Sequence, residues 1–318
     1  VFENSEVTSI ESDPPIVLCN GGEIRAKRVI IATNVPILGA NSVIAATLFQ
    51  TKLASYSSYV IGARIPPRRY PEASFWDTAD PYYYLRIDRG ETEDYAIFGG
   101  RDHKTGQETD TEAHFQELER HLKTLMPEAV IDSRWSGQVV ETPDGLPLIG
   151  EIAPNQFVAT GYCGNGITFG VLAGHMAADW VMGRISLWAE LFSPHRKTVH
   201  AGGAWNYVKE NIDYPVCFIK DKFVQYPEID PAKVAKGHGV VGKYGGETVA
   251  CSRDEKGKLH VVSAVCTHMG CLVRWNESET TWDCPCHGSR FQCDGKVLAG
   301  PAEKPLAIVE AKPERHVG

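Results

Sequence analysis

Two short boxes rich in cysteine and histidine constrain the fold of this chain more than any other sequence feature. Residues 266–271 read Cys-Thr-His-Met-Gly-Cys, and residues 284–289 read Cys-Pro-Cys-His-Gly-Ser. Five of the nine cysteines lie within residues 266–293, which favours a metal site over scattered disulfides. Because Gly-rich turns and short β-type runs fill the sequence from about residue 233, we expect both boxes to belong to a small all-β domain.

Each box supplies one Cys, one His and one extra Cys. A [2Fe-2S] cluster needs four ligands, and two imidazoles on one iron raise its reduction potential relative to an all-cysteine site. Two cysteines and two histidines suit such a cluster and leave one cysteine over in each box. Zinc is the alternative, because Cys and His at such spacings also bind zinc. Zinc would explain neither the extra cysteines nor the glycines of the boxes.

Residues 233–318 resemble a Rieske iron-sulfur domain in both boxes and in a proline-containing segment near residues 300–306, which is similar to the third loop that shields the cluster in that family. The resemblance implies roles for seven residues. It assigns Cys266 and Cys284 to one iron, His268 and His287 to the other, Cys271 and Cys286 to a disulfide, and Ser289 to a hydrogen bond with a bridging sulfide.

The extra cysteines also help to choose within the Rieske family. Rieske oxygenases generally lack these two cysteines and carry a catalytic iron domain after the cluster domain, so the resemblance favours electron transfer over oxygen activation. Phe291 stands where high-potential members often have a tyrosine. One hydrogen bond to the cluster would then be missing, and we expect a lower reduction potential than in those members.

The body of the chain reads as several runs of strands and two helices. Residues 29–32 form a continuous apolar run, typical of a buried parallel strand, and residues 51–100 carry β-type stretches that suggest an antiparallel sheet. Apolar residues spaced by three and four predict a helix over 111–126, with Asp110 or Thr111 as its N-cap. A short strand at 157–160, a glycine loop at 161–166 and a helix at 167–182 complete this part.

The glycine loop has a chemical meaning because it opens a helix. Free backbone N–H groups and the positive helix end face whatever lies there. A reduced flavin accumulates negative charge at its pyrimidine end, and such a helix start would stabilise it. Turn formation alone is the alternative reading of the loop.

Residues 1–183 resemble, in order, the C-terminal part of FAD-dependent oxidoreductases of the D-amino-acid oxidase and glycine/sarcosine oxidase superfamily. The resemblance rests on the strand at 29–34, the segment 135–137, the run 142–150 and the glycine loop with its helix. It implies oxidation of a C–N bond by hydride transfer to the flavin. It assigns Val7, Ala32 and Thr33 to the adenosine part of FAD, and Gly164, Asn165, Gly166, Ile167 and Thr168 to the isoalloxazine.

The substrate would face the flavin from a sheet at about residues 47–135. Arg101 and His103 are the candidate catalytic residues, with Asp102 between them and Tyr84 and Arg86 behind. An arginine could hold a substrate carboxylate bidentately. The alternative is that these polar residues only form the solvent-exposed end of a strand. The resemblance thus implies a small amine or amino acid as substrate and leaves the final electron acceptor unidentified.

The flavoprotein family begins with a G-x-G-x-x-G strand-turn-helix that holds the FAD pyrophosphate, and no such unit occurs here. We therefore expect this sequence to be the C-terminal portion of a longer protein. The missing N-terminal portion would complete the FAD site, so FAD is not expected to bind this chain alone.

Charge and hydropathy exclude other classes. A net charge of −8 argues against nucleic acid as a partner, and no apolar run approaches the ~18–20 residues of a membrane span. We predict a flavoprotein remainder of mixed α+β and α/β class at 1–183, with a parallel strand and an antiparallel substrate sheet. An ordered connector at 184–232 and the all-β Rieske domain at 233–318 would follow.

The function that this organisation implies is an FAD-dependent oxidation whose electrons pass to the [2Fe-2S] cluster, in the bacterial cytoplasm by resemblance. Two alternatives remain open. One is a non-catalytic Rieske electron-transfer module on a vestigial flavin fold, and the other is a redox sensor.

Overall fold

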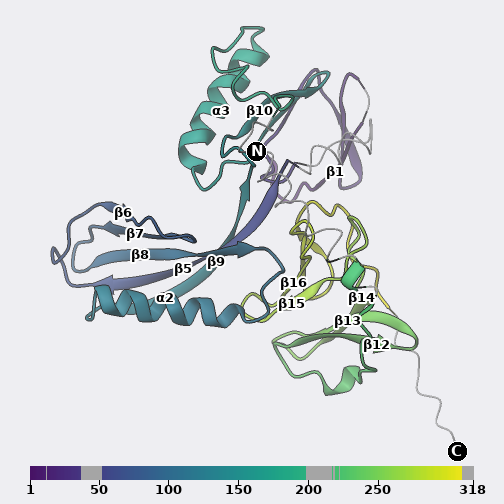
Figure 1. The fold of residues 1–318 in the computed structure, drawn as a ribbon. Coiled ribbons are helices and arrows are strands. Elements are labelled where there is room, and N and C mark those ends of the chain that lie inside the picture. The colour runs from purple at the N-terminus through teal and green to yellow at the C-terminus, as the bar shows by residue number, and fades with distance from the viewer. Residues whose placement is uncertain (12, 37–51, 198–216, 218, 222, 310–318) are drawn as a thin grey trace, which may run out of the picture.

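A computed structural model gives the fold, and it describes residues 1–318 except 12, 37–51, 198–216, 218, 222 and 310–318. Three regions are visible along the chain in Figure 1: a large sheet covered by one helix, a smaller sheet with a second helix, and a β domain at the C-terminal end. The expected fold classes are thus observed, with mostly antiparallel sheets and one mixed sheet.

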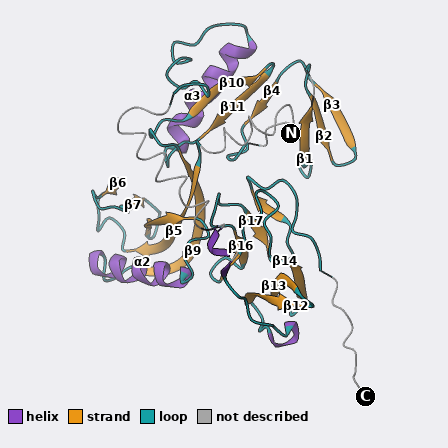
Figure 2. Cartoon of the chain, turned by 45° about the vertical axis from the view of Figure 1, so that its right-hand side comes forward, coloured by secondary structure: helices purple, strands orange, loops and turns teal. Residues whose placement is uncertain are grey.

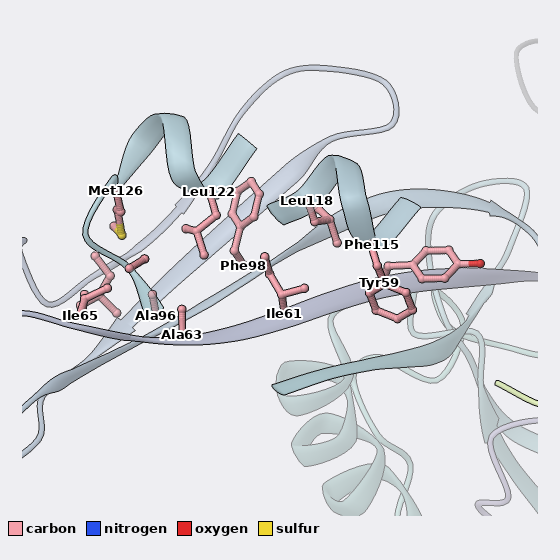
Figure 3. Packing of buried hydrophobic residues seen from close by; sticks show 12 residues of the cluster. Tyr59, Ile61, Ala63, Ile65, Ala96, Phe98, Phe115, Leu118, Leu122 and Met126 are labelled. Carbon is pink, nitrogen blue, oxygen red and sulfur yellow. The ribbon is translucent and has the colours of Figure 1, made fainter. Parts of the chain in front are cut away.

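The large sheet is antiparallel and has five strands. Its order is β6 (Ser74–Trp76), β7 (Tyr83–Asp88), β8 (Asp94–Lys104), β5 (Ala54–Ile65) and β9 (Val130–Glu141). The helix α2 (Thr111–Leu125) packs on one face and buries Phe115, Leu118 and Leu122 against the strands (Figure 3). Burial of three such side chains stabilises this contact by roughly 1.5–3 kcal/mol each.

Helix α2 forms where its sequence pattern indicates. The Asp110 carboxylate accepts a hydrogen bond from the Ala113 N–H at 3.1 Å, so Asp110 and not Thr111 is the N-cap. The helix ends at Leu125, because Pro127 cannot continue the helical hydrogen bonding.

The mixed sheet has the order β10 (Leu148–Ala153), β11 (Gln156–Thr160) and β4 (Val29–Ile31), and β4 runs parallel to β11 as predicted. The expected burial of β4 holds on one side only, since Ile31 is buried while Ile30 is 48% exposed. The helix α3 (Gly166–Val181) packs on this sheet. Beside it lies a small antiparallel sheet of β1 (Val7–Glu11), β2 (Ile16–Cys19) and β3 (Gly22–Arg25).

The first part of the predicted connector packs on the flavoprotein region. The Arg196 guanidinium donates to both carboxylate oxygens of Asp144 at 2.8 and 2.9 Å. Phe192 is buried, and its carbonyl accepts from the Ile149 N–H at 2.7 Å. Residues 198–216 of the connector lie outside the described residues.

The C-terminal domain consists of two small antiparallel sheets. One contains β12 (Gly239–Tyr244), β13 (Glu247–Arg253) and β14 (Leu259–Ser263), and a short 3-10 helix, η1 (Pro231–Lys233), precedes it. The other contains β15 (Arg274–Asn276), β16 (Thr281–Asp283), β17 (Arg290–Gln292) and β18 (Val297–Ala299). Figures 1 and 2 both place this domain beside the end of β9.

Among the described residues, the helices are too short or too polar to cross a membrane.

Candidate metal centre and flavin site

The two cysteine-histidine boxes fold into loops of similar construction. The first box joins β14 to β15 and is closed by a hydrogen bond from Cys266 N–H to Cys271 C=O at 2.8 Å. The second joins β16 to β17 and is closed by Cys284 N–H to Ser289 C=O, also at 2.8 Å. Gly288 has φ +74°, a left-handed conformation that glycine adopts without steric cost.

A disulfide joins the loops. It links Cys271 and Cys286, the pair that the resemblance implied. Both disulfide sulfurs and the Cys284 sulfur lie within 4.8 Å of one another. Because a disulfide sulfur is no thiolate, these three atoms are not the metal-binding set; Cys266 and Cys284 remain as buried free thiols.

The two free thiols lie against each other. A hydrogen bond from the Cys284 thiol is the largest cause that lowers the pKa of Cys266 to about 7, and the same contact raises the pKa of Cys284. The backbone N–H of His268 and the hydroxyl of Ser289 also donate to the Cys266 sulfur. Such converging donors stabilise sulfur in its anionic, metal-binding form.

Two imidazoles complete the donor set. The ring centroids of His268 and His287 lie 4.9 Å apart with nearly perpendicular planes. In the part of the chain that the structure describes, the buried Nδ1 of His268 has no hydrogen-bond partner. Burial lowers the pKa of both rings to about 4, so both are neutral and able to bind metal at pH 7. Two thiols and two neutral imidazoles fit the ligand requirement of a Rieske [2Fe-2S] cluster.

The third loop is attached to this site by Ser289. The Ala302 N–H donates to the buried Ser289 Oγ at 3.0 Å, which leaves the hydroxyl hydrogen directed to sulfur. Phe291 is fully buried in the same apolar cluster as Cys266 and Cys284.

The glycine loop of the flavoprotein region precedes α3, and its second half, residues 164–166, is exposed. Gly164 has φ +79°, and Asn165 is the N-cap but makes no capping hydrogen bond with its side chain. Ile167, in the first turn, is 86% exposed. The five residues assigned to the isoalloxazine, 164–168, are all exposed and therefore form one continuous surface.

Tyr82 lies next to this loop, and Tyr84 and Asp102 lie near Tyr82. A Cβ atom on Gly164 would lie 3.5 Å from Tyr82 Oη. Burial raises the pKa of Asp102, although the Ser58 hydroxyl donates to its carboxylate. Within the described residues, the buried Asp102 Oδ1 has no partner. Tyr84 packs over Gly99, where a Cβ would come within 2.3 Å of its hydroxyl.

The two candidate catalytic residues lie on the other side of the large sheet, against α2. Arg101 Nη2 is 3.3 Å from Glu117 Oε2. His103 Nδ1 lies 2.9 Å from the Lys104 carbonyl, so its Nε2 accepts from Tyr59 Oη at 2.9 Å. A bulge between Ser57 and Tyr59 and a φ of +61° at Arg101 break the strand alternation, which sequence patterns do not reveal.

The residues assigned to adenosine come together at a different place. Val7 and Thr33 line a cavity of about 370 Å³ together with Val35 and the third loop of the C-terminal domain at 300–302. Ala32, next to Thr33, is exposed.

Each half of the chain matches a known protein family. Residues 1–180 match the family described as FAD dependent oxidoreductase, and residues 225–310 match the Rieske [2Fe-2S] domain. The Rieske 2Fe-2S iron-sulfur protein YhfW of Bacillus subtilis is 32% identical over 315 residues, which covers 98% of this chain. The chain spans 60% of that protein's length.

Two further proteins resemble the separate parts. The cytochrome b6-f complex iron-sulfur subunit 1 of a Nostoc species is 55% identical over 53 residues, 17% of this chain and 30% of that subunit. Glycine oxidase from Geobacillus kaustophilus superposes with a TM-score of 0.51 and 24% identity, over 62% of this chain and 53% of the oxidase. This last similarity concerns the fold.

Proposed function

Because this chain belongs to the FAD-dependent oxidoreductase family and carries a Rieske [2Fe-2S] domain, we propose that the whole protein oxidises an amine or amino acid and passes the electrons to the cluster. One observation carries this proposal. Near the same end of the large sheet, Tyr82 contacts the glycine loop on one face, and the other face contacts a cluster-ligand loop. Ser58 belongs to the first face and its neighbour Ser57 to the second.

We assign the substrate contacts to Asp102 and its neighbours. The unpartnered, buried Asp102 Oδ1 suits the positive nitrogen of an amine substrate, which would replace water as its partner. The raised pKa of Asp102 also suits a group that takes a proton from the amine before oxidation. Tyr82 and Tyr84 would orient the substrate between the sheet and the glycine loop.

The exposed start of α3 would lie against the flavin. Backbone N–H groups of its first turn lack a side-chain cap and offer donors to an anionic ring edge. When bound, FAD supplies a two-electron acceptor and the cluster a one-electron acceptor. The same proposal places the protein in the bacterial cytoplasm, as the resemblance implies.

The experiment compares flavin and iron content in this chain and in the product of the whole gene. We expect about one flavin per cluster in the whole product, and bleaching of the flavin band followed by cluster reduction when amines and amino acids are added without oxygen. Cluster without flavin in both preparations would contradict the proposal and leave the electron-transfer module.

The substrate assignment has its own test in the whole product. Asp102→Asn should slow substrate-dependent flavin bleaching about 10²-fold or more, the usual contribution of general acid–base catalysis. Asp88→Asn is the matched control, because Asp88 forms a surface pair with Arg86 on β7. Equal effects of both variants would remove Asp102 from the site.

A further inference from the structure

We propose that the large flavoprotein sheet is a positioning element for the cluster: it holds the second ligand loop, residues 284–289, from outside the Rieske domain. The sequence gives no sign of this contact, because the partners are up to 178 residues apart. The inference concerns the cluster alone and stands whether or not the proposed amine oxidation is correct.

Two glutamine amides bind carbonyls of the ligand loop. Gln138 Nε2, on β9, donates to the Gly288 carbonyl at 2.7 Å and to Thr105 Oγ1 at 3.3 Å, so both of its N–H groups are used. Gln107 Nε2 donates to the Pro285 carbonyl at 3.2 Å. These carbonyls immediately follow His287 and Cys284, so each hydrogen bond acts one residue away from a ligand.

Close packing supports the same contact. A Cβ atom on Gly106, which has φ +79°, would lie 2.8 Å from the carbonyl carbon of Cys284 and from Pro285 N. A Cβ on Gly288 would lie 2.4 Å from Ser55 Cβ. Glycine is therefore required on both sides of the contact: Gly106 lies directly against the backbone of the ligand loop, and Gly288 lies against the Ser55 side chain.

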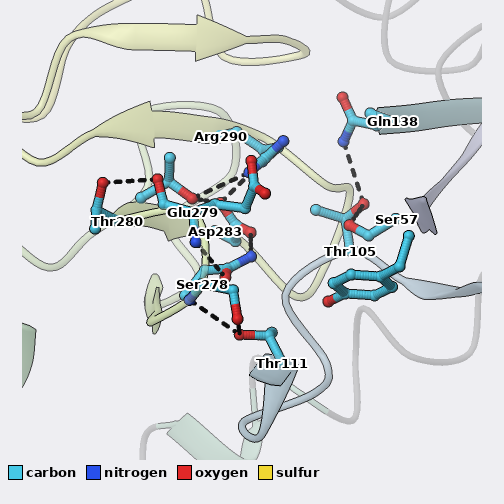
Figure 4. A network of polar contacts seen from close by, with 12 residues as sticks. Ser57, Thr105, Thr111, Gln138, Ser278, Glu279, Thr280, Asp283 and Arg290 are labelled. Atoms are coloured by element: carbon cyan, nitrogen blue, oxygen red, sulfur yellow. Dashed lines mark hydrogen bonds and ion pairs between the residues drawn. The ribbon is translucent and has the colours of Figure 1, made fainter. Parts of the chain in front are cut away.

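The ligand loop also has a rigid base within its own domain. Asp283 directly precedes Cys284, and its buried carboxylate accepts from Asn276 Nδ2 at 2.9 Å, Thr281 Oγ1 at 2.8 Å and Arg290 Nε at 3.1 Å (Figure 4). The Rieske strands thus hold the start of the ligand loop, and the large flavoprotein sheet holds Pro285 and Gly288 within it.

A second contact joins the large-sheet region to the Rieske domain at another place. At the start of α2, Thr111 Oγ1 donates to Ser278 Oγ at 2.9 Å and accepts from the Ser278 N–H at 3.2 Å (Figure 4). Together with the Gln138 and Gln107 contacts, this separate contact restricts rotation of the Rieske domain against the sheet.

The Gln138 amide should influence the cluster electronically. It places the positive end of an N–H dipole at the carbonyl next to His287. Reduction adds a negative charge to a cluster, and buried donors nearby stabilise that charge. Removal of the donor should therefore disfavour reduction.

The first test is Gln138→Leu in the purified full chain reconstituted with iron and sulfide. We expect unchanged cluster content, a changed EPR spectrum, and an equilibrium constant for one-electron reduction that falls about two- to tenfold, as for loss of one hydrogen bond. Gln116→Leu, at an exposed position on α2, is the control and should change neither property. An unchanged EPR spectrum and potential in Gln138→Leu would overturn the proposal.

The second test separates packing from backbone strain. Gly106→Ala and Gly145→Ala both place alanine at a positive φ, +79° and +71°, but only Gly106 packs on the ligand loop, while a Cβ on Gly145 meets nothing within 4 Å. We expect loss of cluster content or an altered EPR spectrum in Gly106→Ala alone. The same cluster content and spectrum in both variants would show that the sheet does not position the loop.

Discussion

At the scale of single residues, the cluster site depends on the protonation states of four side chains, because only neutral imidazoles and thiolates bind metal. Burial keeps His268 and His287 neutral, and the contact between the Cys266 and Cys284 thiols favours the loss of one proton. Since the two remaining cysteines of the boxes form the disulfide, no nearby thiol in the described loops can substitute for a lost ligand.

The ligand set leads to a direct prediction. Cys284→Ala or His287→Ala should abolish the [2Fe-2S] cluster, because three ligands cannot complete the site. The visible absorption and EPR spectra of the reconstituted chain measure this. Cys251→Ala, a buried thiol on β13 outside the boxes, should retain the cluster. A variant of either ligand that kept the spectrum would refute the assignment.

A second prediction concerns the reduction potential. Phe291→Tyr should raise it by about 20–60 mV, the equivalent of one added hydrogen bond in a one-electron couple. The physical reason is that a buried hydroxyl in the same apolar cluster as the ligand thiols can donate to sulfur. Redox titration followed by EPR gives the value, with Phe75→Tyr on the exposed edge strand β6 as control. An unchanged or lowered potential would contradict the argument.

At the scale of elements, α2 carries a buried histidine onto the large sheet. The His114 ring stacks on Tyr59 with centroids 4.8 Å apart and on His103 at 4.9 Å. Burial, which is the largest cause, lowers the pKa of His114 to about 4. The unfolded chain, with an ordinary pKa near 6.5, therefore binds more protons than the folded chain between these two values.

This difference makes the stability depend on pH. The contribution of His114 is fully present above pH ~6.5 and is lost as the pH falls toward 4. His114→Phe should therefore reduce the acid-induced loss of unfolding free energy by about 1–2 kcal/mol, after allowance for solvent screening. Urea unfolding at pH 7 and pH 4.5 measures this. His175→Gln, at an exposed position on α3, is the control and should lose as much unfolding free energy between pH 7 and pH 4.5 as the wild type. The same loss in His114→Phe as in the wild type would contradict the prediction.

At the scale of the whole molecule, the cluster loops belong to two packing units. Their thiols are part of the Rieske core, while the second loop is also covered by residues 105–107 and 138 of the flavoprotein region. Removal of iron should consequently affect both regions.

Hydrogen–deuterium exchange of the cluster-loaded and iron-free chain tests this coupling. Iron removal should increase exchange in residues 266–271 and 284–289 and in the contact at 105–107, because the loop loses its metal-imposed geometry. The amides of α2 that carry Leu118 and Leu122 should stay protected, since their core does not involve the cluster. An increase restricted to the Rieske domain would show that the two regions are uncoupled.

The sequence by itself determined the features that depend on local chemistry. The cysteine-histidine boxes, the period of α2, and the strand, glycine loop and helix at 156–181 each combine residue types whose geometry follows from near neighbours. The short strands β15 to β18 were not predicted, because three residues are too few for a period to be seen.

Only the tertiary structure decided which side chains meet. The bulge in β5 and the positive φ at Arg101 turned Arg101 and His103 toward α2 and left Asp102 near Ser58 and Tyr82. The contact of Gln138 with Gly288 joins residues 150 positions apart. Strand alternation is a local rule, whereas bulges and contacts between domains arise from packing along the whole chain, so neither can be read from the residues around them.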